Sequence, residues 1–83
     1  MSVQKKPSNP VRFPPNPELE QKVEQYLREH KDALTTGEVA AQIGEAFNLT
    51  DRALYNLRNA DKVRIITFQT NEIHWIHMIH LRR

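Results

Sequence analysis

The segment from Thr35 to Arg64 constrains the fold of this chain more than any other. Thr35 and Glu38 have the Thr-x-x-Glu spacing of a capping box, in which each side chain accepts a backbone N–H at the start of a helix. A narrow apolar face follows, made by Val39, Ala40 and Ile43. Gly44 is typical of a helix end, because glycine adopts the left-handed conformation there without strain. This part of the segment therefore predicts a short helix that ends near Gly44.

A second short helix is predicted at about residues 50–60. Thr50 suits its N-cap, because a threonine hydroxyl can accept an N–H of the first turn. Helical spacing brings Ala53, Leu54 and Leu57 to one side, which we expect to face the core. Another side carries polar residues, namely Arg52, Tyr55, Asn56 and Asn59.

Residues 1–16 differ in composition from the remainder of the chain. They contain four prolines, three cations and no acid, which predicts a flexible, basic, proline-rich arm. Val11 and Phe13 are apolar residues of this arm that can dock on the domain. Residues 17–83 are then predicted to form a single domain.

The domain is predicted to begin with a helix and to end with a β-hairpin. Asn16 suits an N-cap and Pro17 suits the first helical position, so we place this helix at about residues 17–31. From Val63 the sequence becomes β-branched and aromatic, is interrupted by polar residues 69–72, and is apolar again up to Leu81. This pattern of two apolar runs separated by polar residues predicts a β-hairpin over residues 63–81.

Three helices followed by a hairpin form an α+β arrangement that resembles the winged helix-turn-helix family over about residues 17–81. Residues 45–48 lengthen the predicted turn beyond the tightest version of the motif. The resemblance implies that residues 50–60 are the recognition helix, that they enter the major groove of DNA, and that the hairpin is the wing. It rests on Glu38-Val39-Ala40 with Gly44 four residues later, and on Leu49-Thr50 leading into Leu54, Tyr55 and Leu57.

The polar side of the 50–60 helix predicts contacts with DNA bases. Arginine can pair with guanine, and asparagine with adenine, through two hydrogen bonds each, while tyrosine can reach a base or a phosphate. We therefore expect base contacts from Arg52, Tyr55, Asn56 and Asn59, with Arg52 and Asn56 foremost. The alternative is an ordinary solvated helix face.

Charge is distributed unevenly along the chain. Residues 17–48 hold seven acids and three cations, whereas residues 49–83 hold six cations and three acids. A basic second half favours a polyanionic partner, although the same cations can simply solubilise a small domain. The expected phosphate contacts are Thr36, Arg58, Lys62, Arg64, Arg82 and Arg83, with Thr36 acting through backbone N–H groups at a helix start.

The apolar run from Ile73 to Leu81 carries three histidines. On a strand, His74 and His80 would share one face and His77 would lie on the other, so the three cannot converge on one metal ion. We expect no metal and no cofactor. A strand that is apolar on both faces needs cover on both, which leads us to predict a homodimer through residues 73–81.

Several function classes are not expected from this sequence. The chain has no cysteine, two glycines and no Gly-rich phosphate loop, and no nucleophile–base pair is visible, so an enzyme is not expected. No signal peptide and no membrane-spanning run are present. We expect a cytoplasmic protein, associated with the nucleoid if it binds DNA.

The sequence thus predicts sequence-specific binding of double-stranded DNA by a small transcriptional regulator of a prokaryote or its phage. One alternative is a winged-helix module for protein–protein contact without nucleic acid, favoured by the acidic stretch 17–48. Another is binding of RNA by shape. A continuous basic surface from Arg52 to Arg64 would favour DNA, whereas interruption by Glu38, Glu45 or Asp51 would favour a protein partner.

Overall fold

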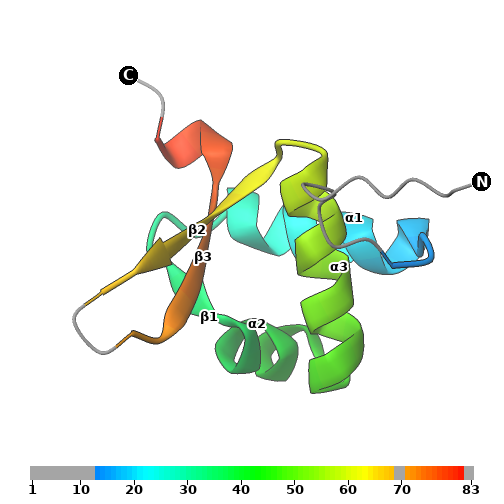
Figure 1. Cartoon of the computed structure of the whole chain (residues 1–83). Helices are drawn as coiled ribbons and strands as arrows, with labels where there is room; N and C mark the ends of the chain where they lie inside the picture. The colour runs from blue at the N-terminus through cyan, green and yellow to red at the C-terminus, as the bar shows by residue number, and fades with distance from the viewer. Residues whose placement is uncertain (1–12, 69–70, 82–83) are drawn as a thin grey trace, which may run out of the picture.

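The computed structural model describes residues 13–68 and 71–81, with three helices packed beside a small antiparallel sheet (Figure 1). No helix in this part of the chain is long and apolar enough to span a bilayer. The elements in chain order are α1 (Pro17–Arg28), β1 (Leu34–Thr35), α2 (Thr36–Ile43), α3 (Phe47–Asn59), β2 (Val63–Thr67), β3 (Ile73–His77) and the 3-10 helix η1 (Met78–His80).

Helix α1 begins as predicted. The Asn16 side chain accepts the backbone N–H of Leu19 at 3.3 Å, and Pro17 occupies the first helical position. The helix ends at Arg28 instead of residue 31, because the backbone N–H groups of Glu29 and His30 close tight bonds onto carbonyls of the last turn. The buried face of α1 consists of Leu19, Val23 and Leu27.

The capping box of α2 is confirmed, and Gly44 ends the helix in a left-handed conformation with φ of 73°. The prediction for the start of α3 was wrong. The helix begins at Phe47, with Ala46 as an N-cap whose side chain makes no capping bond, whereas Thr50 is wholly buried one turn inside the helix. Residues 44–46 alone therefore connect α2 to α3, so the turn is shorter than the sequence suggested.

The predicted hairpin is present, but β3 is shorter than expected and has a second neighbour. Strand β2 pairs with β3 from Val63↔His77 to Thr67↔Ile73. The strand ends at His77, because the His77 ring accepts the backbone N–H of Ile79 and the chain turns into η1. The two-residue strand β1, which we did not predict, pairs with the other edge of β3, giving the order β1-β3-β2.

One apolar cluster joins the helices to the sheet. Trp75 from β3 is wholly buried in it, and Ile76, on the opposite face of the strand, is also buried. Both faces of β3 at Trp75 and Ile76 are thus covered by the chain itself, so a second copy is not needed to bury them. The homodimer stays a prediction. The cluster consists of Leu19, Val23, Leu27, Val39, Ala53, Leu54, Leu57, Val63 and Trp75.

Candidate nucleic-acid interface

Helix α3 presents one polar side to solvent. Its buried side contains Ala53, Leu54 and Leu57, so the predicted inward orientation of these residues is confirmed. The opposite side repeats every three or four residues and consists of Asn48, Arg52, Tyr55 and Asn59, of which the first two are exposed and the last two half-buried. Asn48 was missed because the helix was predicted to start at Thr50; a start at Phe47 adds one turn to this side.

Tyr55 links α3 to the sheet. Its ring meets the Trp75 ring at a centroid distance of 5.1 Å and an angle of 87°, an edge-on contact that favours one orientation of the two rings. The Trp75 indole N–H donates to Thr36 Oγ1 at 2.8 Å, and the Thr36 hydroxyl donates to Asp51 Oδ1 at 3.1 Å. These contacts connect β3, α2 and α3, so they fix the polar side of α3 relative to the hairpin.

Thr36 therefore has a structural role that its sequence context did not reveal. It is 7% exposed, and its hydroxyl is engaged on both sides by Trp75 and Asp51. A phosphate at this helix start would meet backbone N–H groups and not the hydroxyl.

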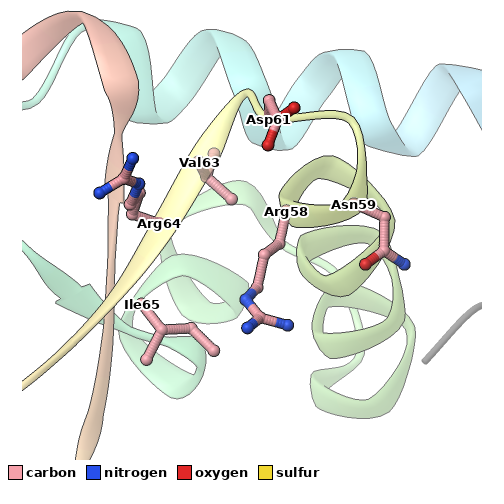
Figure 2. Close-up of a pocket in the computed structure, with 6 residues that line it drawn as sticks. All are labelled: Arg58, Asn59, Asp61, Val63, Arg64 and Ile65. Atoms are coloured by element: carbon pink, nitrogen blue, oxygen red, sulfur yellow. The ribbon is translucent and has the colours of Figure 1, made fainter. Parts of the chain in front are cut away.

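The cations expected to bind phosphate are not all in one place, because Arg58 and Arg64 line one pocket and Lys62 lies apart from it. Figure 2 shows the Arg58 side chain reaching from α3 into the space beside β2, next to Ile65, whereas the Arg64 side chain leaves β2 on the other side. The alternation of β2 agrees, since Val63 is buried and Arg64 is exposed. Lys62 lies towards α1, with its Nζ 3.9 Å from Glu24 Oε1. Of these three cations, Arg58 and Arg64 line the pocket beside α3 and β2, and Arg58 is the one that reaches into it from α3.

Asn56 is engaged inside the chain. Its Oδ1 accepts the backbone N–H of Phe13 at 3.1 Å, and its Nδ2 donates to the Phe13 carbonyl at 3.2 Å and to Glu20 Oε2 at 3.0 Å. The Pro14 carbonyl lies 3.5 Å from the same nitrogen. A base contact by Asn56 would require these bonds to be exchanged for bonds to DNA, and that contact stays a prediction.

Of the two arm residues predicted to dock, Phe13 is confirmed, because it is half-buried against α3, and Val11 lies outside the described residues. Its ring lies 6.3 Å from that of Tyr55, and the Arg52 guanidinium carbon lies 5.8 Å from the centre of the Phe13 ring. Phe13 thus contacts Arg52, Tyr55 and Asn56, three of the four expected base-contact residues. That convergence was not foreseen from the sequence.

The three acids that could interrupt a basic surface each have a partner elsewhere. Glu38 accepts the Thr35 N–H within the capping box, and Glu45 pairs with Lys22 of α1 at 2.9 Å. The Asp51 carboxylate accepts from Thr36. The three carboxylates therefore bond to residues of α1 and of the start of α2, and not to residues on the outer side of α3.

The histidines of the C-terminal run have separate partners. His77 is buried beside Glu24, with Nε2 and Oε2 3.0 Å apart, and His80 Nε2 donates to the Leu27 carbonyl at 2.9 Å. His74 lies on the other face of β3, where its Nδ1 is 3.1 Å from the Glu72 carbonyl. Within residues 13–68 and 71–81, no three His, Cys, Asp or Glu side chains are grouped as metal ligands.

Some expected contacts fall outside the described residues. Arg82 and Arg83, which we expect to contact phosphate, lie beyond residue 81. The predicted arm, with its three cations Lys5, Lys6 and Arg12, is outside the described residues up to residue 12.

Two Zalpha domains are among the solved structures that this chain resembles in fold. The apo Zalpha domain of zebrafish PKZ matches with a TM-score of 0.66 at 22% identity, over 72% of this chain and 91% of that domain. The Zalpha domain of Carassius auratus PKZ in complex with Z-DNA matches with a TM-score of 0.64 at 24% identity, over 74% of this chain and 94% of that domain. No protein-family model matches the sequence. No curated protein matches it either.

Proposed function

We propose that this chain, a winged-helix domain by its three helices, its hairpin and its structural likenesses, binds double-stranded DNA through α3 and the β2–β3 hairpin. The observation that carries the proposal is the polar outer side of α3, where Arg52 and Asn59 are turned away from a leucine-rich core and Tyr55 lies at the edge of that core against Trp75. A helix held by its apolar side with its polar side outward is the usual way in which this fold contacts a duplex.

The residues on this surface divide by the chemistry they can perform. Arg52 and Arg58 carry permanent charge and are exposed, so they suit backbone phosphates. Tyr55 offers a half-exposed ring and a hydroxyl whose position is fixed by Trp75. Such a fixed aromatic group contacts DNA with little loss of side-chain entropy, which supports a direct contact by Tyr55.

The form of the duplex is the second part of the proposal. The likeness to a domain crystallised with Z-DNA makes the left-handed Z form the first duplex to test. The engagement of Asn56 by Phe13 supports the same choice, because it leaves fewer side chains for reading base edges. We therefore propose that the conformation of the duplex, more than its base sequence, determines binding.

Sequence-specific binding by a transcriptional regulator is the second candidate. It is favoured by the exposed Arg52, which has the geometry for a two-bond contact with guanine in a major groove. A good contact of this kind contributes about 1–3 kcal/mol of discrimination.

Fluorescence anisotropy with labelled duplexes separates these candidates. The probes are an alternating methylated d(CG) duplex, a mixed-sequence DNA duplex and an RNA duplex, each titrated at about 50 and 200 mM salt. Circular dichroism of the d(CG) duplex reports conversion to the Z form by inversion of its long-wavelength band. We expect salt-sensitive binding, tightest for the d(CG) duplex, with that inversion.

Each other outcome has a defined meaning. Equal affinity for both DNA duplexes without inversion would keep DNA binding and reject selectivity for the Z form. A preference among mixed sequences that is lost in Arg52→Ala would favour the regulator. If no probe binds at the lower salt concentration, DNA binding is wrong and a protein partner becomes the better interpretation.

A further inference from the structure

The ring of Phe13 supports the side chain of Arg52. The guanidinium carbon of Arg52 lies over the Phe13 ring, 5.8 Å from its centre, which is the arrangement of a cation–π contact. Within residues 13–68 and 71–81, Arg52 forms no ion pair with a carboxylate. A neutral aromatic ring is therefore the partner that holds this exposed cation.

This kind of support leaves Arg52 able to bind an anion. An arginine side chain has five N–H donors, and a carboxylate paired with it in the two-bond geometry would occupy two of them. An aromatic ring attracts the charge as a whole and requires no particular donor, so the donors remain available. A phosphate then meets a guanidinium that is already held, and less side-chain entropy is lost on binding.

Phe13 is itself held on α3 through its backbone. Asn56 Oδ1 accepts the Phe13 N–H at 3.1 Å, and Asn56 Nδ2 donates to the Phe13 carbonyl at 3.2 Å. Glu20 of α1 accepts a further bond from the same amide nitrogen at 3.0 Å. Because the bonds to Asn56 use only backbone atoms of Phe13, a substitution can remove the ring and leave this attachment in place.

The contact between Phe13 and Arg52 lies at the border of the outer side of α3. Arg52 is exposed, and it also lines the crevice between α3 and residues 14–16. The Phe13 ring is 6.3 Å from the ring of Tyr55, which belongs to the same outer side. A group at the border of a helix that enters a groove faces the sugar–phosphate backbone beside the groove, whereas the middle of the helix faces the base edges.

We propose that Phe13 is a positioning residue, whose ring holds the Arg52 guanidinium in place to bind a phosphate group of the DNA backbone. The proposal rests on the proposed DNA binding and assigns to Arg52 a phosphate in place of a base edge. Because a phosphate contact from a fixed position depends on the path of the backbone, it favours one conformation of the duplex and no particular base sequence.

The support of Arg52 by the ring can be measured without DNA. Protons above an aromatic ring are shielded by its ring current, so the NMR resonances of the Arg52 δ protons should lie upfield of those in Phe13→Leu. Phe13→Tyr keeps the ring and should keep this upfield shift. Equal resonances in the unaltered chain and in Phe13→Leu would overturn the proposal, whether or not the chain binds DNA.

The effect of the ring on DNA binding is measured with the full chain and the best-bound duplex. A cation–π contact at an exposed site raises the population of the held Arg52 conformer about 2–5-fold, so Phe13→Leu should weaken binding by about that factor. The same substitution should have no further effect in a chain that already carries Arg52→Ala. Phe13→Tyr should bind as the unaltered chain does.

Two further variants separate the ring from its attachment and from general effects of losing an aromatic side chain. Asn56→Ala releases the backbone of Phe13 but keeps its ring, and should weaken binding only when Arg52 is present. Tyr26→Leu removes from α1 a ring that stacks on His30, and as the matched control it should leave the affinity unchanged. Thermal melting of each variant verifies that the domain is folded.

Three binding results would overturn the proposal while DNA binding itself remained. Phe13→Leu could weaken binding equally with and without Arg52, as a direct DNA contact or a purely structural residue would. Phe13→Leu could instead tighten binding, which would mean that the ring withdraws Arg52 from DNA. A change of the preferred base sequence in Arg52→Ala would make Arg52 a base reader. Absence of binding by the unaltered chain would contradict the proposed function, and the NMR comparison distinguishes that case.

Discussion

The indole N–H of Trp75 donates to the hydroxyl oxygen of Thr36 at 2.8 Å, in a part of the core where Trp75 is wholly buried. The same hydroxyl donates to Asp51, so a single oxygen holds the central strand, the start of α2 and the third helix together. The site residue Tyr55 meets the same tryptophan edge-on. Stability of the core and orientation of the proposed DNA surface therefore depend on the same few atoms.

Thr36→Val should destabilise the domain by about 1–3 kcal/mol, because the buried Trp75 N–H loses its acceptor without a loss of volume at position 36. Thr36→Ser keeps the hydroxyl and is the control, with a smaller loss. Urea unfolding followed by the emission of Trp75, the only tryptophan of the chain, measures both. Equal stability of the Val and Ser variants would show that the bond contributes nothing.

Arg58→Ala should lower the slope of DNA binding against salt by about 0.9, as expected for one phosphate contact. Lys62→Ala should leave that slope unchanged, because Lys62 lies towards Glu24 of α1 whereas Arg58 reaches into the space beside β2 (Figure 2). The two substitutions remove the same charge four residues apart, so they form a matched pair. An equal reduction of the slope in both variants would mean that the sequence interpretation of Lys62 as a phosphate contact was right.

The residues that follow α2 and α3 predict two substitutions with opposite effects on the stability of the domain. Gly44, after α2, has φ of 73°, and Asp61, after α3, has φ of 62°. The left-handed conformation is strained for residues other than glycine, so Gly44→Ala should destabilise the domain and Asp61→Gly should stabilise it, each by about 1 kcal/mol. Thermal melting should show shifts of about 4–8 °C in opposite directions. Shifts of the same sign would contradict this account of the two turns.

Glu24→Ala should destabilise the domain by about 1–3 kcal/mol. His77 is 4% exposed and accepts the Ile79 N–H at Nδ1, so its Nε2 carries the proton that is donated to Glu24. Without the carboxylate, this buried donor has no acceptor. Glu24→Gln retains an oxygen that can accept and should cost less. Urea midpoints of the two variants give the comparison, and a larger loss for Gln than for Ala would contradict it.

The elements with local chemical signals were predictable. Asn16-Pro17 and Thr35-x-x-Glu38 mark helix starts by side chains that bond to neighbouring backbone, and Gly44 marks an end, so these positions could be assigned from the sequence alone. The start of α3 was placed three residues late because its true N-cap, Ala46, has no side-chain acceptor. Thr50 provided a false signal, since its hydroxyl is buried within the helix and has no hydrogen-bond partner among the described residues.

What was missed depends on contacts between residues far apart in the chain. Strand β1 has two residues and exists only through its pairing with β3, so no local pattern can indicate it. The outer side of α3 was predictable from helical spacing, and Arg52, Tyr55 and Asn59 lie there. The bonds of Asn56 to Phe13 join residues 43 positions apart, and helical spacing says nothing of them.

The position of β3 between β1 and β2 determines how the hairpin can unfold. A hairpin attached only by its own turn could fray while the helices stayed intact, but β3 also pairs with β1 at His74 and Trp75 and inserts Trp75 among the helices. Backbone amides of β3 should therefore exchange with solvent deuterium at the rate of global unfolding, together with those of the middle of α1. On the proposed DNA-binding surface, the paired strands β2 and β3 would then have a shape that is already set before the encounter.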